Sequence, residues 1–119
     1  MAFLGQESIW AAAASECANE QDAFWEYHDK LFDSQNGENQ GAFAKANLKQ
    51  FAAELNLDVA AFSECVDSAR YEAQVQADTE AAGQIGWSST PSFIINGQAL
   101  VGAQDFSAFQ GVIDGLLQP

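Results

Sequence analysis

Apolar side chains recur at helical spacing near the start of the chain. The alanine-rich stretch 8–18 places Ile9, Ala13 and Cys17 near one face, which predicts a helix. Over 22–32, large apolar residues follow the i, i+3, i+4, i+7 pattern of an amphipathic helix and predict a wide stripe packed into the core. These residues are Phe24, Trp25, Tyr27, Leu31 and Phe32.

Residues 33–41 contain Ser, Gln, Asn and two Gly without any periodicity, which predicts a surface loop. Asn47, with Gln50 three residues later, resembles a capping box, so we expect a helix to open there and to run to about residue 55. Asp58 is a candidate cap for a further helix over 59–69.

A longer helix is expected over 71–84, and Gly83 and Gly86 can take the left-handed conformation that ends it. The spacing of apolar residues then changes from that of a helix to that of strands. Two apolar segments, 93–95 and 98–101, flank Asn-Gly, which tolerates positive φ at both central positions of a type I′ turn and so predicts a β-hairpin.

Asp105 is expected to cap a closing amphipathic helix, whose apolar side would carry Phe106, Phe109, Val112, Ile113, Leu116 and Leu117. The pattern therefore predicts five helices, a hairpin and a final helix. This order defines an α+β fold that is predominantly helical. The length of 119 residues fits one structural unit with a sizeable core, and a hydrophobic content of 48% supports it.

Charge narrows the range of partners. The formal net charge is −13, with 17 acidic and four basic residues, so nucleic acid and anionic membrane surfaces would be repelled. No apolar run approaches the roughly 18 residues that cross a bilayer, which argues against membrane insertion. The N-terminus lacks the basic region of a signal peptide, leaving open a cytosolic protein, a mature product or a fragment whose leader lies upstream.

Residues that could carry catalysis are few. The only cysteines, Cys17 and Cys65, form no Cys-x-x-Cys pair, and His28, the only histidine, has no Cys, Ser or metal-ligand neighbour at useful spacing. We interpret His28 as an exposed or hydrogen-bonded helix residue. An EF-hand beginning at Asp33 fails because Gly37 would occupy a ligand position. We therefore expect no catalytic residue, no metal and no cofactor in this chain.

The segment Thr90-Pro91 follows a helix, opens the first strand of the Asn-Gly hairpin and is followed by an amphipathic helix. That order resembles the second half of a thioredoxin fold with its cis-proline loop. The segments 4–8, 20–32 and 61–68 extend the similarity, so nearly the whole chain resembles the DsbA-like thiol:disulfide oxidoreductase family. The resemblance implies that residues 1–86 form the family's helical insertion and that residues 87–119 form the C-terminal hairpin and helix.

The resemblance also implies a division of function. The family's first strands and its Cys-x-x-Cys helix would lie before Met1, so the isolated chain is expected to be redox-inert. Thr90 and Pro91 would bind an extended segment of a substrate through backbone hydrogen bonds. The substrates would be proteins or peptides that carry thiols or disulfides, in an extracytoplasmic compartment such as the periplasm or cell envelope.

Relatives that carry the equivalents of Cys17 and Cys65 use them as a bridge between insertion helices, which implies a Cys17–Cys65 disulfide here. Two buried free thiols, as in a reducing cytosol, are the alternative.

Two other functions stay open. The chain could be a non-catalytic module that binds peptides or proteins. It could also belong to the related isomerases and transferases that use glutathione and keep the proline loop. On either account a hairpin alone is marginal, so we expect the isolated chain to dimerise, swap elements or borrow a strand.

Overall fold

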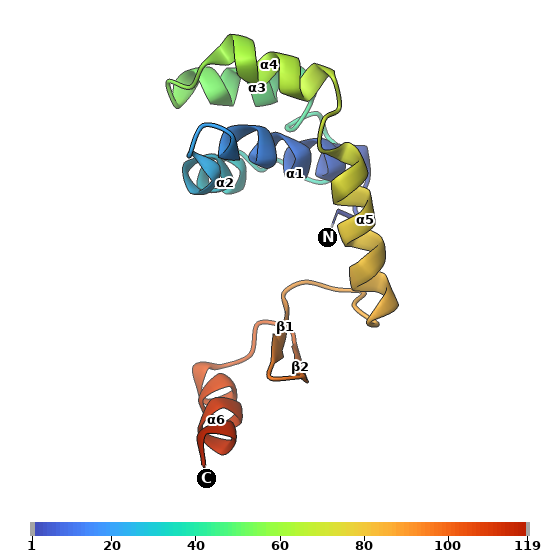
Figure 1. The fold of residues 1–119 in the computed structure, drawn as a ribbon, viewed down its shortest axis with the longest axis vertical. Coiled ribbons are helices and arrows are strands. Elements are labelled where there is room, and N and C mark those ends of the chain that lie inside the picture. Colours follow the sequence, from blue (N-terminus) through green and yellow to red (C-terminus); the bar gives the residue numbers. More distant parts are fainter. Residues whose placement is uncertain (1, 119) are drawn as a thin grey trace. The chain divides into compact units, whose positions relative to one another are not determined.

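The computed structural model describes residues 2–118 (Figure 1). In chain order the elements are α1 (Gln6–Asn19), α2 (Phe24–Asp33), α3 (Lys45–Glu54), α4 (Val59–Asp67), α5 (Glu72–Gln84), β1 (Ser92–Ile95), β2 (Gln98–Val101) and α6 (Phe106–Leu117). The predicted α+β, mainly helical fold is confirmed. Contacts group the chain into two units, residues 1–81 and 82–119. The expected division into 1–86 and 87–119 stays a prediction.

The core of the first unit lies among α1 to α4, where α1 contacts the other three helices (Figure 1). Small side chains on α1, among them Ala14 and Ala18, are fully buried and let its neighbours approach closely. The largest fully buried side chains are Tyr27, Leu48, Phe62, Cys17 and Cys65. One apolar core therefore joins helices that are widely separated in sequence.

The buried face of α2 is narrower than predicted, so the prediction of a wide stripe is wrong. Tyr27 is fully buried, but Trp25 is 69% exposed and Phe32 is 62% exposed. Tyr27 and Leu31, one turn apart, lie on the side that meets the core, whereas Trp25 and Phe32 lie on another side of the helix. A helix packed by one face buries a narrower set of residues than the apolar pattern contains.

Two of the three predicted N-cap residues occupy the N-cap position, and one of these two, Asp58, also forms side-chain capping bonds. The Asp58 carboxylate accepts hydrogen bonds from the N–H groups of Ala60 and Ala61, both at 3.0 Å, so this cap is confirmed. The predicted capping box is wrong, because α3 begins before Asn47, whose Nδ2 donates back to the Gly41 carbonyl in the preceding loop at 2.9 Å.

Asp105 occupies the predicted N-cap position of α6, and its carbonyl accepts from Ala108 N at 2.9 Å, but its side chain makes no capping hydrogen bond. The glycine stop after α5 is formed by Gly86, with φ 85°, whereas Gly83 lies inside the helix. Trp87 N donates to Ala82 O at 3.1 Å and Gly86 N donates to Gly83 O at 3.0 Å, which is the Schellman pattern.

The second unit contains the predicted hairpin. Strands β1 and β2 are antiparallel, with Ser92 opposite Val101 and Ile95 opposite Gln98. Asn96 and Gly97 join them with φ values of 47° and 85°, as a type I′ turn requires. The two-residue loop therefore fixes the register of the strands.

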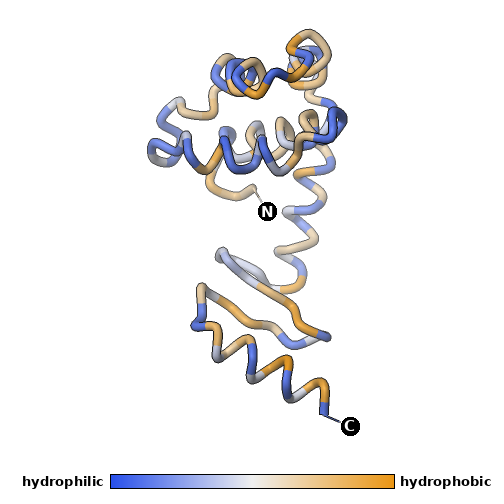
Figure 2. Tube along the Cα trace, turned by 90° about the vertical axis from the view of Figure 1, so that its left-hand side faces the viewer, coloured by the Kyte–Doolittle hydropathy of each residue, from blue (hydrophilic) through white to orange (hydrophobic). Residues whose placement is uncertain are grey.

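Helix α6 packs on the hairpin through an edge-to-face contact of Phe93 and Phe109, whose ring centroids are 4.9 Å apart. No residue of β1, β2 or α6 is buried within the described chain, and Phe106 and Leu117 are 79% and 76% exposed. Figure 2 shows apolar positions interspersed with polar ones along α6. The amphipathic helix was predicted correctly, but its apolar side is only partly covered.

Candidate functional site

The loop that contains Thr90 and Pro91 is held to the hairpin on both sides. The Ser92 hydroxyl donates to the Ser89 carbonyl at 2.7 Å, and Gly102 N donates to the Pro91 carbonyl at 2.8 Å. The second bond continues the β1–β2 pairing one step beyond Ser92 and Val101. The Thr90–Pro91 peptide bond is cis.

The backbone of Thr90 is available for binding. Thr90 and Pro91 are both exposed, and within residues 2–118 neither the N–H nor the C=O of Thr90 takes part in a hydrogen bond. Each backbone donor and acceptor needs a partner, which here is solvent or an incoming chain. One residue that offers both groups, on a loop fixed at either end, can pair with an extended peptide.

The neighbouring strand also has a free edge. Strand β1 pairs with β2 on one side, and the described part of the chain provides no strand for its other side. Exposed strand edges are sites where another polypeptide can add. The outer edge of β1 is therefore a second place where a strand could pair with this unit.

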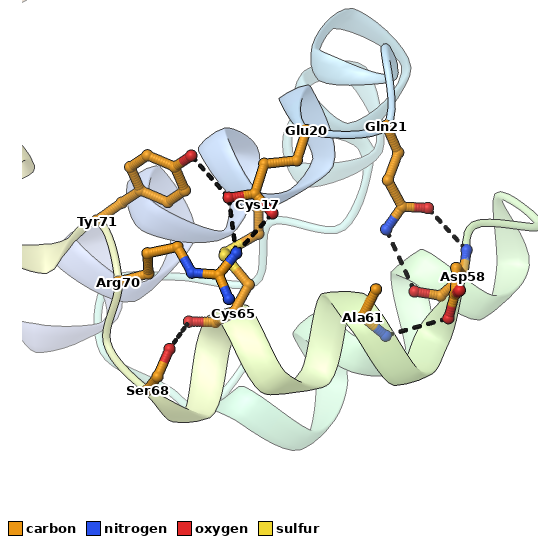
Figure 3. Close-up of polar contacts among 9 residues, drawn as sticks. All are labelled: Cys17, Glu20, Gln21, Asp58, Ala61, Cys65, Ser68, Arg70 and Tyr71. Atoms are coloured by element: carbon orange, nitrogen blue, oxygen red, sulfur yellow. Dashed lines mark hydrogen bonds and ion pairs between the residues drawn. A yellow bond between two sulfur atoms is a disulfide. The ribbon is translucent and has the colours of Figure 1, made fainter.

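Cys17 of α1 and Cys65 of α4 are joined by a disulfide in the structure (Figure 3). Each residue is 1% exposed. Thiol–disulfide exchange requires a thiolate to reach one of the sulfur atoms, and burial prevents this while the first unit is folded. The bond therefore has the position of a structural link between two helices rather than that of a reactive disulfide.

A polar cluster lies beside the disulfide (Figure 3). Arg70 Nη1 lies 2.8 Å from both carboxylate oxygens of Glu20, and the Tyr71 hydroxyl donates to Oε1 of Glu20 at 2.8 Å. The hydrogen bonds from Arg70 and Tyr71 lower the pKa of Glu20, and the Glu20 carboxylate raises the pKa of Tyr71. These contacts attach the segment after α4 to the end of α1.

Gln21 makes a second link in the same region (Figure 3). Its Nε2 donates to the Asp58 carbonyl at 3.2 Å, and its Oε1 accepts from Asp58 N at 2.7 Å. The amide thus completes a two-way backbone pairing at the start of α4. Sequence reasoning missed this contact and the Arg70 cluster, because partners so far apart in the chain leave no local pattern.

His28 lies on α2 and faces other aromatic rings. Its ring centroid is 4.7 Å from that of Phe32 and 5.4 Å from that of Trp25, and its Nδ1 is 3.0 Å from Oδ1 of Asp29. Within residues 2–118, no group of three or more His, Cys, Asp or Glu side chains is arranged to hold a metal ion. In the same range no helix is both long and apolar enough to cross a bilayer.

The family model described as thioredoxin matches residues 1–115. The chain belongs to the thioredoxin family. A probable disulfide bond formation protein D of Bacillus anthracis is 27% identical over 116 residues, covering 94% of this chain and 52% of the relative. Disulfide bond formation protein D of Bacillus subtilis is 25% identical, with the same coverage. The predicted resemblance to the DsbA-like proteins is confirmed, and it supports a place among the thiol–disulfide oxidoreductases.

A second group of relatives was not anticipated. The Na(+)/H(+) antiporter NhaA of Herminiimonas arsenicoxydans is 35% identical over 104 residues, which cover 87% of this chain and 16% of the antiporter. The chain spans about half of the disulfide bond formation proteins and a much smaller share of the antiporters. No solved structure matches significantly. Segments similar to this chain thus occur within proteins that have different names.

Proposed function

We propose that this chain is the substrate-binding part of a DsbA-like thiol–disulfide oxidoreductase. The free N–H and C=O of Thr90, beside Pro91, pair with the backbone of an extended protein or peptide substrate that carries thiols or disulfides. This unpaired backbone on an anchored, exposed loop is the observation that carries the proposal. Backbone pairing reads little sequence, which suits an enzyme that acts on many proteins.

The chain alone is proposed to be redox-inert. Its 119 residues contain no Cys-x-x-Cys, and the two cysteines present are buried in one disulfide. Exchange needs a thiolate nucleophile of lowered pKa, which neither sulfur supplies. The disulfide itself, and the relatives named for disulfide bond formation, support action in an extracytoplasmic, oxidising compartment.

Binding is tested with a peptide taken from an unfolded substrate protein, with its cysteines replaced by serine. Titration followed by backbone NMR should move the amide signals of Thr90 and Gly102. The matched control is the same peptide N-methylated along its backbone, which keeps the side chains but removes the donors and should bind at least about tenfold more weakly. Equal binding of both peptides, or signals that move only in α1 to α4, would contradict the proposal.

Redox inertness is tested separately by insulin reduction and by oxidative refolding of a reduced substrate. The chain should show no turnover above a control in which Cys17 and Cys65 are both replaced by alanine. Turnover by the chain that is absent from this control would refute the proposal that the chain is redox-inert. The proposal that Thr90 binds peptides would be unaffected.

The alternative function is a non-catalytic binding module. It is favoured by the similarity to segments of Na(+)/H(+) antiporters, proteins whose names indicate no thiol chemistry. The two functions are distinguished by assaying the natural polypeptide, purified as the cell makes it. Oxidative refolding catalysed by that polypeptide supports the oxidoreductase, whereas peptide binding without any turnover supports the module.

A further inference from the structure

Helix α2 carries a row of aromatic side chains, two exposed and two half-buried, that the proposed function does not use. We call Phe24, Trp25, His28 and Phe32 the aromatic row. Their rings contact one another, with centroids 5.1 Å apart for Phe24 and Trp25 and 4.7 Å apart for His28 and Phe32. Trp25 and Phe32 remain mostly exposed. Large apolar side chains that support one another at the surface form a ready platform for a partner.

A hollow of about 570 Å³ adjoins the aromatic row and shares Phe32 with it. Its apolar wall includes Leu4, Ala11, Leu31 and Phe43. The loop that closes it is held by Glu7 of α1, whose carboxylate accepts from Gly41 N at 2.8 Å and from Phe43 N at 2.9 Å. The hollow is therefore formed by fixed elements of the first unit and is large enough to receive an apolar side chain.

Acidic side chains run beside the aromatic row. Glu26, Asp29 and Asp33, spaced by three and four positions along α2, are all exposed, and we call them the acidic row. The chain has four basic residues, and each pairs with a carboxylate outside the acidic row. The pairs are Lys30–Glu54, Lys45–Glu72, Lys49–Asp67 and Arg70–Glu20. Within residues 2–118 no lysine or arginine pairs with the acidic row, and the one side-chain partner there is His28, whose Nδ1 lies 3.0 Å from Oδ1 of Asp29.

We propose that the aromatic row, the acidic row and the hollow together bind a basic segment of another protein that also carries apolar side chains. The partner's apolar residues pack on Trp25 and Phe32, and one enters the hollow. Its lysine or arginine side chains pair with the acidic row or lie over the aromatic rings. The net charge of −13 steers such a cationic segment towards the chain and repels anionic partners.

The probe is an amphipathic peptide of leucine and lysine, and its matched control has glutamate at every lysine position. Backbone NMR should show the lysine peptide moving signals of α2 and of the residues that line the hollow. Trp25→Ala and Phe32→Ala should each weaken binding about tenfold, because central aromatic side chains dominate such interfaces. Phe106→Ala, which removes a still more exposed ring from α6, should leave affinity unchanged.

Charge is tested with Glu26→Gln/Asp29→Asn against Asp78→Asn/Glu80→Gln, an exposed pair on α5. The first double variant should bind the lysine peptide more weakly and with less salt dependence, whereas the second should resemble the wild type. Equal binding of the glutamate peptide, or unchanged affinity in both aromatic variants, overturns the proposal. A second copy of the chain is the other candidate occupant. If Trp25→Ala abolishes self-association of the chain, and the lysine peptide does not compete with that self-association, the site binds a second copy and the proposal is overturned.

Discussion

Tyr27 places a phenol hydroxyl inside the apolar core of the first unit. Its ring lies 5.2 Å from that of Phe62, and its hydroxyl donates to the Leu48 carbonyl at 2.8 Å. A buried hydroxyl without a partner would destabilise the fold, so this bond fixes how α2 packs on α3. Burial raises the pKa of Tyr27, because the ionised phenolate loses its hydration in the core.

Tyr27→Phe should lower the free energy of unfolding by about 1 kcal/mol near neutral pH, measured by urea denaturation. Because the pKa of Tyr27 is raised, this difference in the free energy of unfolding depends on pH. Below the ordinary tyrosine pKa of 10 its stabilising contribution is complete, and it falls as rising pH ionises Tyr27 in the unfolded state first. The difference between wild type and variant should therefore shrink above that pH. A difference that stays constant would contradict the assignment.

The Cys17–Cys65 disulfide closes a loop with a sequence separation of 48. In the chain-entropy model, a crosslink of this span stabilises the folded state by about 4 kcal/mol. Cys17→Ala/Cys65→Ala should therefore lower the midpoint of urea unfolding strongly, and reductant should have the same effect on the wild type but none on the variant. Mass spectrometry of the unreduced chain, showing two free thiols, would contradict the pairing.

At the scale of elements, the start of α4 depends on its cap. Asp58→Ala removes the acceptor for the N–H groups of Ala60 and Ala61 and should lower the free energy of unfolding by about 1 kcal/mol. Asp58→Asn is the matched control, because asparagine caps nearly as well. Equal losses in urea denaturation would show that the charge of Asp58, rather than its capping bonds, matters.

Element type and order could be predicted because local signals agree with the fold. Asn96-Gly97 sets the hairpin, Gly86 ends α5 and Asp58 begins α4. The burial of α2 could not be predicted in the same way. Periodicity shows which residues share a face, but the exposure of Trp25 and Phe32 depends on where α1 and α3 contact the helix.

The candidate site could be predicted only in part from the sequence. Thr90-Pro91 before a hairpin pointed to the loop, since proline and the turn are local features. The hydrogen bond from Gly102 to Pro91 follows from the strand register that Asn96-Gly97 sets. The unpaired backbone of Thr90 depends on which groups the rest of the chain brings near it, and no short motif encodes that. The burial of Cys17 and Cys65 against each other is likewise a tertiary property.

At the scale of the whole molecule, the second unit leaves apolar surface exposed. Phe93 packs on α6, whereas Ile94, its neighbour on the opposite face of the strand, is 51% exposed. Within residues 2–118, no strand pairs with the outer edge of β1. We expect the isolated chain to associate through this strand. Sedimentation equilibrium should show dimers or larger species, reduced in Ile94→Lys. A wild-type monomer at high concentration would contradict this expectation.

The relatives fit a domain that is used in several proteins. The chain matches half of the disulfide bond formation proteins and a small share of the antiporters. Both groups are compatible with the proposal that this unit contributes binding. The Thr90 backbone is the feature on which that interpretation rests.

The central claim is tested most directly by hydrogen exchange at the Thr90 amide, with and without the serine-substituted substrate peptide. Thr90 N–H has no partner within the described chain, so it should exchange rapidly alone and at least about tenfold more slowly with saturating peptide. Ile113 N–H in α6 serves as the internal control. Unchanged exchange at Thr90, despite demonstrated peptide binding, would contradict the account.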